Sequence, residues 1–172
     1  MKSIFSFVAI ATFVFSALNV NAQDKNKRPS PPDKVTVTTS KGVTISVDYS
    51  QPSVKGRTIG KEIAPFGKIW RTGANEATVF ETNKDVKIDG KTLKAGKYGL
   101  YTIPGEKDWT IIFNNKSTLW GDDGYSESDD ALRLMTPAGK PLTFTEKMTF
   151  SIEKSGKISL MWGDIMVSFM VN

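Results

Sequence analysis

A short stretch of the chain carries an indole, a guanidinium, an amide and a carboxylate within seven consecutive positions, at Trp70, Arg71, Asn75 and Glu76. A guanidinium and an amide can donate hydrogen bonds to a ligand, and a carboxylate can accept them. A polar atom buried beside an indole needs a partner, because leaving it unpaired costs free energy. The stretch therefore predicts either a tightly bonded corner of the fold or the floor of a binding site.

Gly73 lies in the middle of this stretch, where the chain is expected to turn. A turn would let Arg71 and Glu76 meet as a partly buried pair, and the Asn75 amide would bond the backbone of the turn. In one interpretation this pair fixes a crossing between strands, with Trp70 packed beneath it. In the other, the four side chains line a pocket in which Arg71 and Asn75 bind the ligand.

A second polar region forms a loop that combines acidic and aromatic side chains, among them Trp120, Asp122, Asp123 and Tyr125. Aromatic faces stack on sugar rings, and carboxylates accept hydrogen bonds from sugar hydroxyls, so the loop is a candidate secondary binding site. Oxygen ligands between Asp122 and Asp130 also suit Ca²⁺, although their spacing does not follow the EF-hand pattern. The remaining interpretation is a solvated acidic loop with Trp120 folded back onto the sheet.

The composition excludes several kinds of site. The chain contains no Cys and no His, which removes disulfides, Ser-His-Asp and Cys-His triads, ordinary zinc sites and haem ligation by these residues. No resident metal or other cofactor is predicted. The net charge of +5 comes from scattered lysines and arginines rather than from a basic stripe, so nucleic acid is not an expected partner.

Catalysis by this chain would have to rest on Asp, Glu, Lys, Tyr, Ser or Arg. Glycoside hydrolysis needs two carboxylates at about 5 to 10 Å, and the candidates are Asp48, Glu76, Asp122 and Glu146. They lie on different expected strands or loops, and sequence spacing does not give the distances between them. Trp109 and Trp162 alternate within expected strands and are predicted to be core residues.

The N-terminal region has the features of a secretory signal. Lys2 precedes an apolar run at 4–18 that is shorter than the roughly 20 residues of a membrane span, and small residues precede Gln23. We expect residues 1–22 to be a cleaved signal peptide and the protein to be secreted or periplasmic. An uncleaved anchor or a buried helix is the alternative. Residues 23–33 are predicted to be a disordered leader rich in Pro and Lys, followed by one domain at 34–172.

From residue 34 onward, apolar and polar residues alternate with period two between turn signals. This pattern predicts strands at 43–49, 68–72 and 97–103, among others, and the Asp89-Gly90 pair predicts a tight hairpin. Nine to eleven short strands with little or no helix fit an all-β, antiparallel β-sandwich or jelly-roll-like fold better than a small barrel.

Several phrases occur in an order typical of one known family: DYSQPSVKGR at 48–57, IWRTGANEAT at 69–78, KAGKY at 94–98, LYTIPG at 100–105, WTIIFN at 109–114 and WG at 120–121. The chain resembles the domain of unknown function 2911 family of exported bacterial proteins, over nearly its whole length after the leader. The resemblance implies a secreted or periplasmic β-rich domain without an established biochemical activity.

Three functions are compatible with these observations. The preferred one is a non-catalytic exported domain that binds an extracellular or envelope ligand, such as a glycan, through the residues from Trp70 to Glu76 and the Trp120 loop. The second is a carboxylate-dependent hydrolase of a cell-surface polymer. The third is an envelope scaffold whose exposed strand edges pair with another protein.

Overall fold

The computed structural model describes residues 24–172, and the signal peptide expected at 1–22 lies outside this range. Helix in the described part is confined to two 3-10 turns, η1 (Lys25–Lys27) and η2 (Glu127–Asp129), and no helix there could cross a membrane. The strands are β1 (Pro32–Thr38), β2 (Thr44–Ser50), β3 (Thr78–Thr82), β4 (Val86–Ile88), β5 (Lys91–Leu93), β6 (Gly96–Ile103), β7 (Asp108–Asn114), β8 (Asp130–Gly139), β9 (Thr145–Ile152), β10 (Lys157–Gly163) and β11 (Ile165–Met170).

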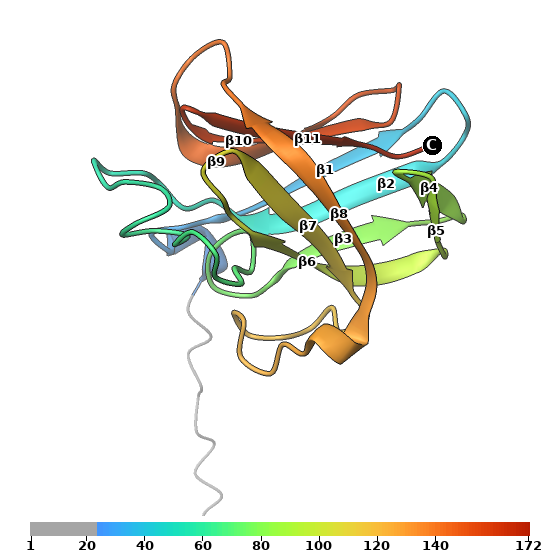
Figure 1. The fold of residues 1–172 in the computed structure, drawn as a ribbon, viewed down its shortest axis with the longest axis horizontal. Helices are drawn as coiled ribbons and strands as arrows, with labels where there is room; N and C mark the ends of the chain where they lie inside the picture. Colours follow the sequence, from blue (N-terminus) through green and yellow to red (C-terminus); the bar gives the residue numbers. More distant parts are fainter. Residues whose placement is uncertain (1–23) are drawn as a thin grey trace, which may run out of the picture.

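Nine strands form one antiparallel sheet in the order β1-β2-β3-β6-β7-β8-β11-β10-β9, and β4 pairs with β5 separately. The long strand β8 pairs with β7 along most of its length and with β11 at Ala138 and Gly139, so it carries the sheet from one layer to the other (Figure 1). The end strands β1 and β9 approach each other, which makes the sheet a nearly closed barrel. The predicted all-β antiparallel class and strand number are confirmed, and the two layers belong to one continuous sheet.

Alternation along β2 shows how the sequence selects the buried face. Ile45, Val47 and Tyr49 are buried, as expected for residues two positions apart on a strand. The Tyr49 hydroxyl donates to Asp33 of β1 at 2.8 Å and accepts from the Phe150 backbone N–H of β9 at 3.1 Å. One phenol therefore joins the two end strands of the sheet.

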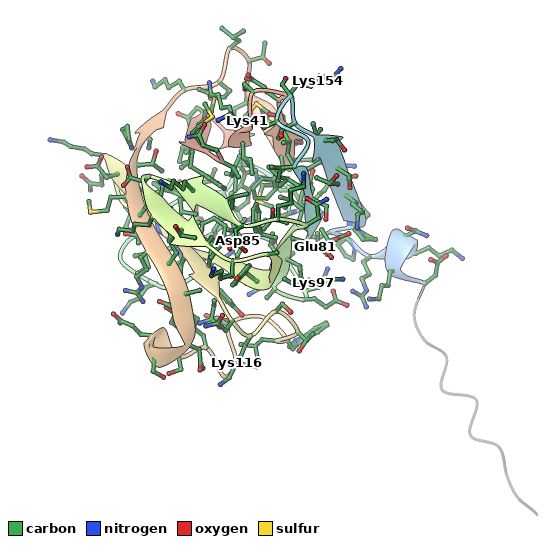
Figure 2. All side chains as sticks on the ribbon, turned by 90° about the vertical axis from the view of Figure 1, so that its right-hand side faces the viewer. Lys41, Glu81, Asp85, Lys97, Lys116 and Lys154 are labelled. Atoms are coloured by element: carbon green, nitrogen blue, oxygen red, sulfur yellow. The ribbon has the colours of Figure 1, made fainter. Side chains whose placement is uncertain are left out.

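Aromatic side chains occupy much of the interior, where side chains fill the space between the layers (Figure 2). The Trp70 ring stacks on Trp162 with a centroid separation of 5.2 Å and meets Trp109 edge-on at 6.1 Å. Trp109 and Trp162 are each 1% exposed, which confirms that they are core residues. Trp70 is the third member of this core cluster, at 8% exposure.

The predicted Asp89-Gly90 hairpin is confirmed. Both residues have positive φ, 50° and 74°, and they connect Ile88 to its partner Lys91. A two-residue loop of this kind matches the twist of the flanking strands, which is why the local sequence identified it.

One expectation differs from the structure. The predicted strand at 68–72 is wrong, because only Trp70 pairs with β6 and Thr72 leaves the extended conformation with φ of 54°. The disordered leader expected at 23–33 stays a prediction, and the part of it that the structure describes, 24–33, contacts the domain. Pro32 and Asp33 belong to β1, and residues before them bond to the domain.

Candidate functional site

Residues Trp70 to Glu76 form a tight turn beside β6. The Trp70 N–H donates to the Thr102 carbonyl at 2.8 Å, and the Thr102 N–H donates back at 2.9 Å. Thr72 has a left-handed conformation that is rare for a β-branched residue, and the Thr78 hydroxyl holds its carbonyl at 2.7 Å. The chain turns here as the sequence predicted.

This turn brings the two predicted polar regions together. The Gly121 N–H donates to the Asn75 carbonyl at 3.1 Å, and Glu76 pairs with Trp120 in an isolated antiparallel bridge. A Cβ atom placed on Gly121 would lie 3.8 Å from Nη1 of Arg71, so the second loop packs against the Arg71 side chain. The turn and the acidic loop are therefore parts of one surface.

The predicted pair between Arg71 and Glu76 is not formed, and that expectation is wrong. The nearest carboxylate to Arg71 is Asp122 of the acidic loop, whose Oδ1 lies 4.0 Å from Nη1. The Arg71 side chain is 32% exposed, yet its Nε is buried and has no hydrogen-bond partner among residues 24–172. The turn sends Arg71 and Glu76 to different neighbours, because two residues with left-handed backbone conformation, Thr72 and Asn75, lie between them.

Glu76 and Asn75 hold the N-terminal leader instead. Nη1 of Arg28 donates to both Glu76 carboxylate oxygens, at 3.1 and 2.9 Å, and Nζ of Lys25 lies 3.0 Å from Oε1. Nδ2 of Asn75 donates to the Ser30 carbonyl at 3.1 Å. Half of the predicted site thus anchors the segment that precedes β1.

The environment of Glu76 lowers the pKa of its carboxyl to about 2 from an ordinary value of 4.5. Partial burial alone would raise the pKa, but the hydrogen bonds from its own backbone N–H, from Lys25 and from Arg28 outweigh that effect. Glu76 is therefore fully ionised at neutral pH and engaged with two cations.

Trp70 and Arg71 face a pocket of about 370 Å³, which we name the Arg71 pocket. Its polar and aromatic lining consists of Ser30, Arg57, Trp70, Arg71, Asp122 and Trp162. Nε1 of Trp162 is buried and lacks a hydrogen-bond partner within the described chain. The volume falls at the lower end of the range for small-molecule sites.

Arg57 is fixed in place at the edge of this pocket. Its Nε donates to the Val54 carbonyl at 3.1 Å and its Nη2 to the Ser53 carbonyl at 2.7 Å. These bonds hold the guanidinium in one orientation although the residue is exposed. A guanidinium fixed in this way loses less side-chain entropy when it binds a ligand.

A larger hollow of about 670 Å³ adjoins Arg57 on the side of β10 and β11. Its walls include Phe66, Phe144 and Lys140, and the Phe144 side chain is exposed. None of the buried unpaired side-chain donors found in residues 24–172 lines this hollow. The Arg71 pocket is therefore the better candidate for specific recognition.

The other end of the acidic loop has a different character. The Tyr125 hydroxyl donates to Oδ2 of Asp130 at 2.9 Å and accepts from Nη2 of Arg133 at 2.6 Å. Nε of Arg133 also bonds Asp130 directly, and Nη1 lies 3.0 Å from Glu127. Burial first, and then the bond to Asp130, raise the pKa of Tyr125 to about 12, so this phenol stays neutral. Tyr125 thus belongs to a bonded network rather than to the Arg71 pocket.

Trp120 and Asp123 lie on the surface of the acidic loop, and Trp120 is 58% exposed. The carboxylates of the loop point to separate cations: Asp122 to Arg71, Asp129 to Lys116 and Asp130 to Arg133. Within residues 24–172, no group of three or more acidic side chains is arranged to hold a metal ion. The calcium site stays a prediction without structural support from this loop.

Sequence reasoning missed two residues of the site. Arg28 is the main partner of Glu76 although the two lie 48 positions apart, and no local spacing connects them. Arg57 occurs in a long connection with Gly56 before it, a context that indicates a turn rather than a binding residue. Trp162 was identified as a core residue, but its position against the pocket depends on the packing of β10.

Comparison with known proteins places this chain in one family. Residues 30–171 match the family described as proteins of unknown function, DUF2911. No curated protein and no solved structure matches the chain. The matched range contains the Trp70 turn, the acidic loop and all eleven strands, and it confirms the resemblance seen in the sequence phrases. The chain belongs to the DUF2911 family of proteins of unknown function.

Proposed function

We propose that this chain is an exported, non-catalytic domain that binds an extracellular or envelope ligand, such as a glycan, in the Arg71 pocket. Export is supported by the signal-like sequence at 1–22, which makes the secreted or periplasmic space the proposed location. The binding role is supported by the arrangement of fixed donors around a pocket of suitable volume.

The observation that carries the proposal is the incomplete bonding of Arg71. Its Nε is buried without a partner among the described residues, and its closest carboxylate, on Asp122, is 4.0 Å away. An unpaired buried donor costs about 1–3 kcal/mol. The exposed part of the guanidinium also makes no hydrogen bond within residues 24–172, and a ligand with hydrogen-bond acceptors would bond these accessible nitrogens, whereas a purely structural arginine would be bonded within the protein.

The alternative of a carboxylate-dependent hydrolase receives less support. A general acid needs a carboxyl that is protonated at neutral pH, so its pKa must be raised. The pKa of Glu76, the candidate nearest the turn, is lowered to about 2 by its own backbone, Lys25 and Arg28 against the opposing effect of burial. Glu76 is suited to hold the leader rather than to transfer a proton.

A glycan array tests the proposal with native protein and the Arg71→Gln variant. We expect native protein to bind at least one glycan, and the variant to bind it about ten-fold more weakly, as expected for loss of one charge-assisted hydrogen bond. The matched control is Lys41→Gln, which removes a charge in the loop before β2 (Figure 2). The pocket lies near the other end of this strand, where Pro52 follows it. Equal binding by the native and Arg71→Gln proteins, or binding to no glycan at all, would contradict the proposal.

A further inference from the structure

The Arg71 pocket offers more hydrogen-bond donors than acceptors. Its charged lining residues are Arg57, Arg71 and Asp122, that is, two positive groups and one negative group. Two nitrogens near it, Nε of Arg71 and Nε1 of Trp162, are buried and find no acceptor within residues 24–172. A neutral ligand would leave the excess positive charge without a counterion.

Asp122 does not neutralise Arg71 as a close partner would. The separation of 4.0 Å is longer than the roughly 2.7–2.9 Å of a charge-assisted hydrogen bond between a guanidinium and a carboxylate. Arg57 has only carbonyl partners, on Val54 and Ser53, which leave its charge uncompensated. Both guanidinium groups therefore keep the capacity to bind an anionic group.

We infer that the ligand of the Arg71 pocket is an acidic glycan, a chain of uronic acid sugars whose carboxylate is held by Arg71 and Arg57. The inference rests on the proposed function and specifies its ligand class. A planar guanidinium matches a carboxylate with two parallel hydrogen bonds, and arginine is favoured where such recognition is needed. The two guanidinium groups of the lining and its net positive charge carry this choice.

A sugar suits the surroundings better than a peptide carboxylate does. Trp120 is exposed and directly precedes Gly121, which packs against the Arg71 side chain. An exposed indole offers a face for stacking a pyranose ring, and the Asp122 carboxylate accepts hydrogen bonds from hydroxyls. The Asp122 carboxylate and the Arg71 guanidinium serve the hydroxyls and the acid group of the sugar residue in the pocket, and the exposed Trp120 indole, which lies outside the pocket lining, serves a neighbouring ring of the chain.

The experiment measures binding of the full chain to a tetrasaccharide of galacturonic acid and to its methyl ester, by calorimetry. We expect the acid to bind and the ester to bind about ten- to hundred-fold more weakly, because the ester cannot form the charge-assisted pair. Raising the salt concentration should weaken binding of the acid and leave the ester unaffected.

Three variants separate the role of Arg71 from general loss of charge. Arg71→Gln should reduce the preference for the acid over the ester about ten-fold, because only Arg57 then faces the carboxylate, and Arg71→Lys should reduce it less, since lysine retains the charge without the planar fork. Lys41→Gln, far from the pocket, should bind as the native protein does. The midpoint of urea unfolding checks that each variant is folded.

The outcomes distinguish failure of this inference from failure of the proposed function. Equal binding of acid and ester, with both weakened in Arg71→Gln, would overturn the acidic class and leave glycan binding in place. Binding of a peptide with a free C-terminal carboxylate, but of neither tetrasaccharide, would overturn the glycan class. No binding of any glycan would overturn both. A preference for the acid that Arg71→Gln reduces about ten-fold supports the inference.

Discussion

The two ends of the acidic loop each meet an arginine, and the two arginines differ in how completely they are bonded. At the C-terminal end, Arg133 contacts Asp130, Glu127 and the Tyr125 hydroxyl. At the N-terminal end, Arg71 has Asp122 at 4.0 Å and a buried Nε without a partner in the described chain. Both arginines have carboxylates and aromatic rings as neighbours, so residue types do not distinguish them.

The difference indicates which arginine serves the fold and which is available for recognition. A network in which each polar group is bonded stabilises one conformation and has no free donors for a ligand. An arginine whose donors are left unpaired beside a pocket costs stability that a ligand can restore. Hydrogen-bond satisfaction, rather than local density of polar residues, separates the two roles.

The largest effect is expected from Arg133→Gln. This change removes the cation from the buried Asp130 carboxylate and leaves the Tyr125 hydroxyl with one partner fewer. The free energy of unfolding should fall by about 2–3 kcal/mol, as is typical when one partner of a bonded charged network is lost. Urea unfolding followed by tryptophan fluorescence measures this loss.

The matched variant for this prediction is Arg133→Lys, which keeps the charge but cannot bond Asp130 and Tyr125 with a planar fork. It should lie between the native protein and Arg133→Gln. A stability of Arg133→Gln within about 0.5 kcal/mol of native, the usual range for surface changes, would remove the distinction between the two arginines.

A smaller effect is expected where Glu76 holds the leader. Because the folded-state pKa of about 2 is below the ordinary value of 4.5, the ionised carboxylate adds stability above about pH 4.5 that is lost as the pH falls towards 2. The carboxylate is 39% exposed, so solvent screening reduces this contribution to about 1 kcal/mol. Native protein should therefore be more stable to unfolding than Glu76→Gln by about 1 kcal/mol above pH 4.5, and this difference should approach zero as the pH falls towards 2.

Limited proteolysis gives an independent measure of the same contact. Trypsin cleaves after Lys25 and Lys27, and both sites belong to η1. Ion pairs from Lys25 and from Arg28, the residue after η1, attach this segment to Glu76. Cleavage should be faster in Glu76→Gln than in native protein at neutral pH. Identical cleavage rates would mean that Glu76 does not hold the leader in solution.

The sequence predicted the sheet well where alternation is strong and local. The apolar positions of β2, β9 and β11 match buried faces, because period two fixes which side of a strand is buried, whereas β6 and β7 are buried on both faces over most of their length. The predicted strand at 68–72 failed because Thr72 adopts positive φ, and nothing in the alternation of polar and apolar residues reports that turn. Strand order is set by pairing between distant segments, which periodicity does not encode.

The site was predicted in part. The sequence identified Trp70, Arg71 and the acidic loop, which the fold brings together through Asn75 and Gly121. It did not identify the true partners, because Arg71 meets Asp122 and Glu76 meets Arg28 across about fifty positions of chain. Arg71 and Glu76 lie five positions apart in the sequence, but tertiary packing rather than spacing along the chain decides which charges meet.

The smallest change in the free energy of unfolding is expected for Arg71→Met. This free energy should stay the same or rise slightly, whereas it should fall for Arg133→Gln. Arg71→Met removes a guanidinium whose Nε is buried without a partner among residues 24–172, and the remaining ion pair to Asp122 is long and half-exposed. A long, exposed pair contributes roughly 0–1 kcal/mol, which relief of the unpaired Nε offsets. Arg71→Met should therefore unfold within about 0.5 kcal/mol of native protein, or be slightly more stable.

Asp122→Asn is the control, since it removes the other charge of the pair and should likewise leave the urea midpoint nearly unchanged. If Arg71→Met instead loses as much stability as Arg133→Gln, Arg71 is a structural residue and its open geometry does not indicate a binding site. If Arg71→Met is as stable as native protein but no longer binds the acidic tetrasaccharide, the Arg71 guanidinium acts in recognition. The fold does not need this side chain in that case, and the ligand does.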